Sequence, residues 1–257
     1  MLKTRVAILF ICLAALCINC TGNKGLVKKK ARAAEDLGLS YLQQGNLNVG
    51  IKHLIDAARL DPESASIQHK LALAYKDLGE YDKSLVHFKK ALSLRPGFPE
   101  AQNNLGTLYL MMGEWDLAIG CFEKTLSDVT YKTPYFAYSN LGLAYYNKGE
   151  YQRAINSYQQ ALRLFPSYGL GYFNLALTYE AIQRWEEAIN AYEKAISYYP
   201  EYPLAHLNVG KLYLNLGRND KAAKELGFAI ELDPKGPYGK EAKELLEKHR
   251  LDIRSVR

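Results

Sequence analysis

Four asparagines recur along the chain at a nearly fixed spacing, and their side chains could do recognition chemistry. Asn104 is followed by Asn140, Asn174 and Asn208, at intervals of 36, 34 and 34 residues. An asparagine amide both donates and accepts hydrogen bonds, so a row of amides can pair with the backbone of an extended peptide whatever its sequence. The alternative is that each amide braces neighbouring helices of its own chain. The sequence leaves both interpretations open.

Large apolar residues accompany the last three of these asparagines. The residues four positions before an asparagine are Phe136, Leu170 and Leu204, and the residues directly before one are Phe173 and Leu207. We expect them to form one surface patch with Leu143, Leu177 and Tyr146, and to point away from the packing interfaces of the fold. A contiguous apolar patch on a soluble surface indicates a protein partner.

The residues that usually carry out catalysis form no recognisable pattern. The five histidines (His53, His69, His87, His206, His249) are scattered, and no HExxH, P-loop, dinucleotide-binding glycine cluster or GxSxG motif occurs. We therefore expect a binding protein with no enzymatic activity, no metal, no cofactor and no small-molecule substrate.

The charge of the chain gives no indication of nucleic-acid binding. The net charge is +6, and part of it lies at the two ends. Elsewhere Lys and Glu alternate, which is typical of solvated helix faces. No basic stripe with interleaved aromatic residues is present, so we expect no nucleic-acid partner.

The asparagine spacing belongs to a repeat that covers most of the chain. Six units span residues 31–64, 65–98, 99–134, 135–168, 169–202 and 203–236, and all have 34 residues except the third, which has 36. Position 11 of every unit is tyrosine (Tyr41, Tyr75, Tyr109, Tyr145, Tyr179, Tyr213), and position 32 is proline in five of the six. Positions 8, 20 and 27 are small. This is the pattern of the tetratricopeptide repeat (TPR).

The repeat predicts an all-α fold, a right-handed superhelical solenoid of six helix-turn-helix repeats. Small residues let two helices approach closely, a glycine at position 15 ends the first helix, and the proline at position 32 stops the second. One unit cannot bury its apolar face alone, so the units stack. Residues 237–257 are expected to form a C-terminal capping helix and tail, because their pattern is amphipathic.

The N-terminus is expected to be a targeting segment. Residues 1–19 contain two basic residues and then an apolar run that is too short for a permanent membrane span but suits a signal peptide. The run ends in "LCINC" and resembles a bacterial lipoprotein signal, which implies that Cys20 carries the lipid and that residues 20–30 are a linker. An uncleaved anchor and plain secretion are the alternatives. Cys12 and Cys17 would be removed with the signal peptide, so Cys121 would be the one cysteine of the mature protein without a lipid.

The complete arrangement resembles the type IV pilus pilotin family, the PilF, PilW and Tgl type. The similarity lies in the lipoprotein signal, the opening repeat "AAEDLGLSYLQQGNLNVGIKHLIDAARLDPES" and the lengthened third junction "LSDVTYKTPYFAYSNLG". It implies a lipid-anchored protein on the periplasmic face of the outer membrane. Its implied role is to assist the localisation and assembly of secretin subunits for the pilus.

Two other functions remain open at this stage. The chain could be a general periplasmic TPR adaptor lipoprotein in envelope complex assembly, which would share the anchor and the fold. A cytoplasmic chaperone-like TPR protein is the third reading, and the signal sequence argues against it. Identification of the protein partner would separate the first two.

Overall fold

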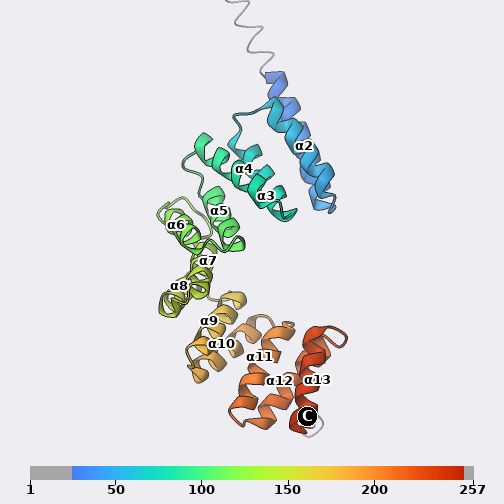
Figure 1. Cartoon of the computed structure of the whole chain (residues 1–257), viewed down its shortest axis with the longest axis vertical. Helices are drawn as coiled ribbons and strands as arrows, with labels where there is room; N and C mark the ends of the chain where they lie inside the picture. The colour runs from blue at the N-terminus through green and yellow to red at the C-terminus, as the bar shows by residue number, and fades with distance from the viewer. Residues whose placement is uncertain (1–24, 252–257) are drawn as a thin grey trace, which may run out of the picture. The chain divides into compact units, whose positions relative to one another are not determined.

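The structure, a computed structural model, describes residues 25–251, and all of its regular elements are α-helices. The expected signal peptide, Cys20 and the last six residues lie outside this range. The described chain divides after Gly113 into two compact units, which we call the N-terminal unit and the C-terminal unit. The predicted all-α class is confirmed (Figure 1).

The N-terminal unit begins with a helix that covers residues 25–43. It continues with α2 (Leu47–Leu60), α3 (Ala65–Asp77), α4 (Tyr81–Leu94) and α5 (Pro99–Met111). The helices α2 to α5 pack in sequence, each against the next. Turns of a few residues join them, as short connections between neighbouring helices require.

The C-terminal unit contains eight further helices. They are α6 (Trp115–Leu126), α7 (Pro134–Asn147), α8 (Tyr151–Leu164), α9 (Gly169–Ala181), α10 (Trp185–Tyr198), α11 (Pro203–Asn215), α12 (Asn219–Leu232) and α13 (Pro237–His249). Within this unit too, each helix packs against the next one along the chain. The first helices of the repeats here are α7, α9 and α11.

The small residues of the repeat lie where helices come closest. Ala154, Ala188 and Ala222, all at position 20, are completely buried. At position 8, a Cβ added to Gly142 would lie 2.8 Å from the ring of Tyr158, which is closer than real Cβ contacts. Positions 8 and 20 therefore accept only small residues, because the two helices of one repeat contact each other closely there.

The turn at position 15 requires a left-handed backbone. Gly149 has a φ angle of 79°, a value that glycine adopts without a steric penalty. In the fifth repeat Gln183 occupies the same position and has a φ angle of 59°. The turn is therefore kept even where the glycine is missing, at a cost in backbone strain.

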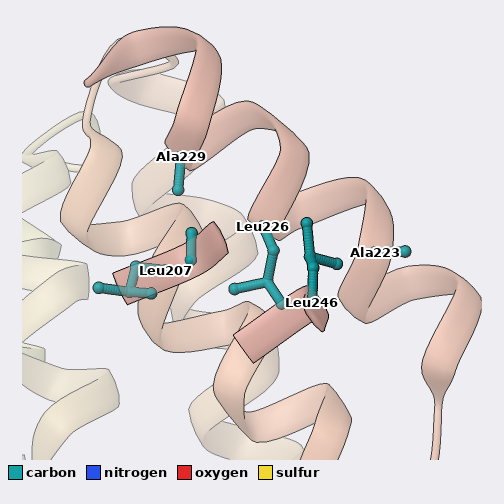
Figure 2. Packing of buried hydrophobic residues seen from close by; sticks show 6 residues of the cluster. Leu207, Ala223, Leu226, Ala229 and Leu246 are labelled. Atoms are coloured by element: carbon teal, nitrogen blue, oxygen red, sulfur yellow. The ribbon is translucent and has the colours of Figure 1, made fainter. Parts of the chain in front are cut away.

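The last helix, α13, closes the C-terminal unit as the capping helix that the sequence predicts. Ala242 and Leu246 of α13 pack with Leu207 of α11 and Leu226 of α12 in one buried cluster (Figure 2). The outward residues Lys243, Glu244, Glu247 and Lys248 are exposed. None of the helices within residues 25–251 is long and apolar enough to cross a membrane.

Candidate binding surface

The predicted row of asparagines divides between the two units, with Asn104 on α5 in the N-terminal unit. Its side-chain nitrogen Nδ2 lies 2.9 Å from the ring nitrogen Nε2 of His69 on α3. Burial lowers the pKa of His69 to about 4, so the ring is neutral at pH 7 and accepts the amide proton. The Asn104 amide therefore braces two helices of its own unit.

The other three asparagines lie on α7, α9 and α11 of the C-terminal unit. Asn208 donates through Nδ2 to the hydroxyl of Tyr192 on α10, at 3.4 Å. Asn140 and Asn174 are partly exposed, and their amides make no hydrogen bond to any other residue within 25–251. Both interpretations of the row thus apply, each to different members. Asn104 and Asn208 brace helices, whereas Asn140 and Asn174 keep their donors and acceptors available.

Two members of the predicted apolar patch are exposed and four are partly buried. Phe136 is 42 % exposed and Leu170 is 45 % exposed, which fits a surface role. The partly buried members are Leu143, Tyr146, Leu177 and Leu204. These six residues keep part of their side chains available to a partner.

The expectation that Phe173 and Leu207 point to the surface is wrong. Phe173 is 5 % exposed, and its ring packs on the rings of Tyr192 and Tyr202 with centroid distances of 5.7 and 4.9 Å. Leu207 is 1 % exposed and belongs to the cluster around Leu226 (Figure 2). The side chain at position 5 of these repeats contacts the second helix of its own repeat and the segment that follows that helix. Both residues are therefore core residues.

An aromatic pocket lies at the start of α7 and α9 and at the ends of α8 and α10. It encloses about 600 Å³ and is lined by Tyr135, Phe136, Phe165, Ser167, Tyr168, Gly169, Leu170, Tyr199 and Tyr202. Four of the rings form a contiguous group, since the ring centroid of Tyr135 lies 4.3 Å from that of Phe136, 4.8 Å from that of Phe165 and 5.4 Å from that of Tyr168. Tyr199, at the rim, is 62 % exposed. No lining residue carries a charge, so the pocket suits an apolar side chain.

The prediction named Phe136 and Leu170 but missed the other rings of this pocket. Phe165 and Tyr199 stand at position 31 and Tyr168 and Tyr202 at position 34, on either side of the position-32 proline. The other repeats have Asp61, Arg95, Val129 and Asp233 at position 31. The TPR pattern does not require aromatic residues there. The presence of aromatic residues at both positions in the fourth and fifth repeats is the sequence feature from which the pocket could have been predicted.

A carboxylate network lies at the other end of α9. Glu180 accepts a hydrogen bond from the hydroxyl of Tyr192, the same hydroxyl that Asn208 contacts. Burial raises the pKa of Glu180, although the Tyr192 bond and the charge of Lys211 act in the opposite direction. Lys211 itself bonds to Glu241 on α13, with 2.5 Å between Nζ and Oε1.

Metal-ligating side chains do not gather anywhere in the described part of the chain. No group of three or more His, Cys, Asp or Glu residues within 25–251 has the placement to hold an ion. Cys121 is a buried cysteine of α6.

Comparison with known families agrees with the repeat pattern. Models of the tetratricopeptide repeat match residues 35–92, 135–168 and 173–237, and a TPR repeat model matches residues 74–113. No curated protein sequence matches the chain.

Similar solved structures include PilW and PilF. PilW, described as a widely conserved type IV pilus biogenesis factor, is 24 % identical with a TM-score of 0.76, and the match covers 84 % of this chain and 98 % of PilW. PilF of Pseudomonas aeruginosa is 21 % identical with a TM-score of 0.73, and the match covers 86 % of this chain and 99 % of PilF. At these identities the likeness shows a common fold.

A third similar structure is that of MamA. It is 31 % identical with a TM-score of 0.58, and the match covers 68 % of this chain and 94 % of MamA. The family models, this likeness and the buried small residues at the repeat positions all agree. The chain belongs to the tetratricopeptide repeat family.

Proposed function

We propose that this protein is a non-catalytic scaffold that binds a secretin subunit and assists its localisation and assembly in type IV pilus biogenesis. The partner is held on the C-terminal unit, through the aromatic pocket and the free amides of Asn140 and Asn174. TPR proteins bind protein partners, so the scaffold role follows from the family. What the proposal adds is that this partner is a secretin subunit.

The observation that carries the proposal is the extent of the structural match. PilW and PilF align over 84 and 86 % of this chain with TM-scores of 0.76 and 0.73, whereas MamA aligns over 68 % with a TM-score of 0.58. PilW is described as a type IV pilus biogenesis factor. The exposed aromatic pocket supports the binding role independently, because a soluble surface rarely leaves such a group uncovered.

The proposed location is the periplasmic face of the outer membrane, with Cys20 as the lipid attachment site. This part rests on the apolar run of residues 6–18 and the "LCINC" sequence alone. Stable anchoring by lipid requires two or more acyl chains, because one chain binds only marginally. The lipoprotein type of modification supplies the first two as a diacylglyceryl group on the cysteine.

A second candidate function is that of a general adaptor for protein complexes of the cell envelope. The uncharged aromatic pocket and the amides of Asn140 and Asn174 favour it, because they suit an apolar side chain and a peptide backbone without specifying one protein partner. An adaptor would use the same pocket and the same amides. The two candidates differ only in the partner that is bound.

Deletion of the gene tests the proposal directly. Without this protein, secretin subunits should remain monomeric, and heat-stable multimers should be lost from membrane extracts analysed by gel electrophoresis. Expression of the full chain from a plasmid should restore them. Normal multimers in the deletion strain would exclude the secretin role and leave the general adaptor.

A further inference from the structure

The first helix of the N-terminal unit, residues 25–43, carries a cluster of positive charge near its start. Four exposed cations lie within its first eight residues, and we call them the basic face: Lys28, Lys29, Lys30 and Arg32. No acidic residue occurs among residues 21–34 of the sequence. None of the four cations forms an ion pair with another residue in the range 25–251. The charge of the basic face is therefore available to a partner.

The packing of this helix directs the basic face away from the core. Ala31 is 2 % exposed and packs in one buried cluster with Ala57 of α2. Successive residues of an α-helix differ by about 100° in direction. Lys28, Lys29 and Arg32 therefore share one arc of about 100°, and Lys29 lies nearly opposite Ala31.

Interactions within the helix do not account for this placement of charge. The N-terminus is the positive end of the helix macrodipole, so cations in the first turns are unfavourable and acidic residues are preferred there. Lys28 and Arg32 are also four residues apart, a spacing at which like charges repel each other. The basic face thus lowers the stability of the free helix, and an anionic surface would relieve this cost.

An exposed apolar side chain lies among the cations. Leu26 is 53 % exposed, and its direction around the helix axis falls between those of Lys29 and Lys30. Leucine flanked by lysines suits the boundary of a membrane, where the leucine enters the apolar layer. The lysine stems lie along that layer and hold their ammonium groups among the headgroups. A nucleic acid would contact the cations but would leave the leucine in water.

We propose that the basic face, together with Leu26, binds the headgroup layer of a membrane that contains anionic phospholipid. This contact goes beyond the proposed function, since it requires neither a secretin nor a lipid on Cys20. It is compatible with both, because Lys28 follows Cys20 by eight residues and a chain spans at most about 3.6 Å per residue. A lipid on Cys20 would hold the basic face within about 29 Å of the membrane surface.

Co-sedimentation with lipid vesicles tests this contact on the unlipidated chain from residue 21 onward, which keeps every residue that the structure describes. The protein should bind vesicles of phosphatidylcholine with about one third phosphatidylglycerol at least about thirtyfold more tightly than vesicles of phosphatidylcholine alone. Each cation near an anionic surface contributes roughly a fivefold gain in affinity, so two of the four already give this factor. Binding should weaken steeply as salt is added, because salt screens exposed charges.

Two variants with the same loss of charge make the result specific to the basic face. The first combines Lys28→Gln, Lys29→Gln, Lys30→Gln and Arg32→Gln. The second replaces four exposed lysines of the C-terminal unit: Lys224→Gln, Lys240→Gln, Lys243→Gln and Lys248→Gln. The first variant should bind the anionic vesicles at least about thirtyfold more weakly than the wild type, and the second should bind them nearly as the wild type does. In thermal unfolding the first should be at least as stable as the wild type, because it removes cations from a helix N-terminus.

Three results would overturn the inference. The wild type would fail to bind the anionic vesicles or would bind both kinds of vesicle equally, or the two variants would bind alike. Tighter binding to polyglutamate or to duplex DNA than to the anionic vesicles would instead assign the basic face to an acidic protein or a nucleic acid. All of these results leave the secretin role intact, and loss of the secretin role leaves the membrane contact intact, because the two are placed on different units of the chain.

Discussion

The side-chain nitrogen of Asn104 lies 2.9 Å from the Nε2 atom of His69, and the contact joins the first helices of two successive repeats. His69 also packs against the rings of Phe88 and Phe98, with centroid distances of 5.8 and 4.9 Å. The imidazole therefore combines an apolar environment with a single amide donor. Both features favour the neutral ring.

The buried His69 should make the N-terminal unit less stable in mild acid. Its pKa is about 4 in the folded chain, against a usual 6.5, because burial outweighs the attraction of Glu100, and Lys70 acts in the same direction as burial. Between these values the unfolded chain binds more protons, so the free energy of unfolding falls as the pH decreases from 6.5 to 4. The loss should be about 2–3 kcal/mol.

Hydrogen exchange of the α3 and α5 amides, corrected for intrinsic rates, would measure this loss. His69→Gln should reduce the pH dependence, and a smaller part should remain because burial also lowers the pKa of His87. His249→Gln, at the exposed end of α13, is the control and should change nothing in these helices. An unchanged slope in His69→Gln would contradict the assignment.

The four asparagines should respond differently to substitution by alanine. Asn104→Ala should lower the stability of the N-terminal unit by about 1 kcal/mol, because a hydrogen bond between helices is lost. Asn140→Ala and Asn174→Ala should leave stability within about 0.5 kcal/mol and weaken partner binding. Parallel denaturation and binding curves check this. Stability losses of about 1 kcal/mol in Asn140→Ala and Asn174→Ala as well would instead assign these amides to bracing.

Phe173→Ala should destabilise the C-terminal unit by about 3–5 kcal/mol, since it removes a buried ring from contact with Tyr192 and Tyr202. Leu170→Ala, three residues earlier on the same helix, is the matched control and should cost less than about 1 kcal/mol because its side chain is exposed. Equilibrium unfolding in urea, followed by tryptophan fluorescence, measures both. Similar values for the two variants would refute the burial of Phe173.

Gln183→Gly should stabilise the protein by about 0.5–1 kcal/mol. A left-handed residue other than glycine costs about 1–2 kcal/mol, and the greater freedom of glycine in the unfolded chain cancels part of the gain. The reverse change, Gly149→Gln, places a side chain at a φ angle of 79° and should destabilise by a similar amount. A lower melting temperature for Gln183→Gly would show that the glutamine side chain makes a compensating contact.

The helical fold could be predicted from the sequence because the same packing contact is specified six times. The tyrosine at position 11 and the small residue at position 20 occur in every repeat, and each reflects the same close contact between two helices. A departure from the pattern in one repeat therefore does not change the predicted fold. Gln183 shows how far this holds, because the turn keeps its left-handed conformation without the expected glycine.

The binding surface could be predicted only in part, since repeat position does not determine the partners of a side chain. Phe173 and Asn174 are adjacent and were placed on the same face, but successive helical residues differ by about 100° in direction, and Phe173 packs inward. The amide of Asn104 bonds to His69, which occupies position 5 of the preceding repeat. The equivalent residue for Asn174 is Ser139, whose side chain is shorter, and the Asn174 amide forms no such hydrogen bond among the described residues.

The central claim is that the aromatic pocket of the C-terminal unit binds the secretin partner, and affinity capture from native membranes tests it most directly. Tagged wild type and the double variant Phe165→Ala/Tyr199→Ala would be compared with Val129→Ala, an exposed apolar residue that does not line the pocket. Truncated aromatic contacts in a binding site commonly cost more than about 2 kcal/mol. We predict that secretin recovered with the double variant falls at least about thirtyfold, while Val129→Ala recovers the wild-type amount. Equal recovery of secretin by the folded double variant and the wild type would contradict the account.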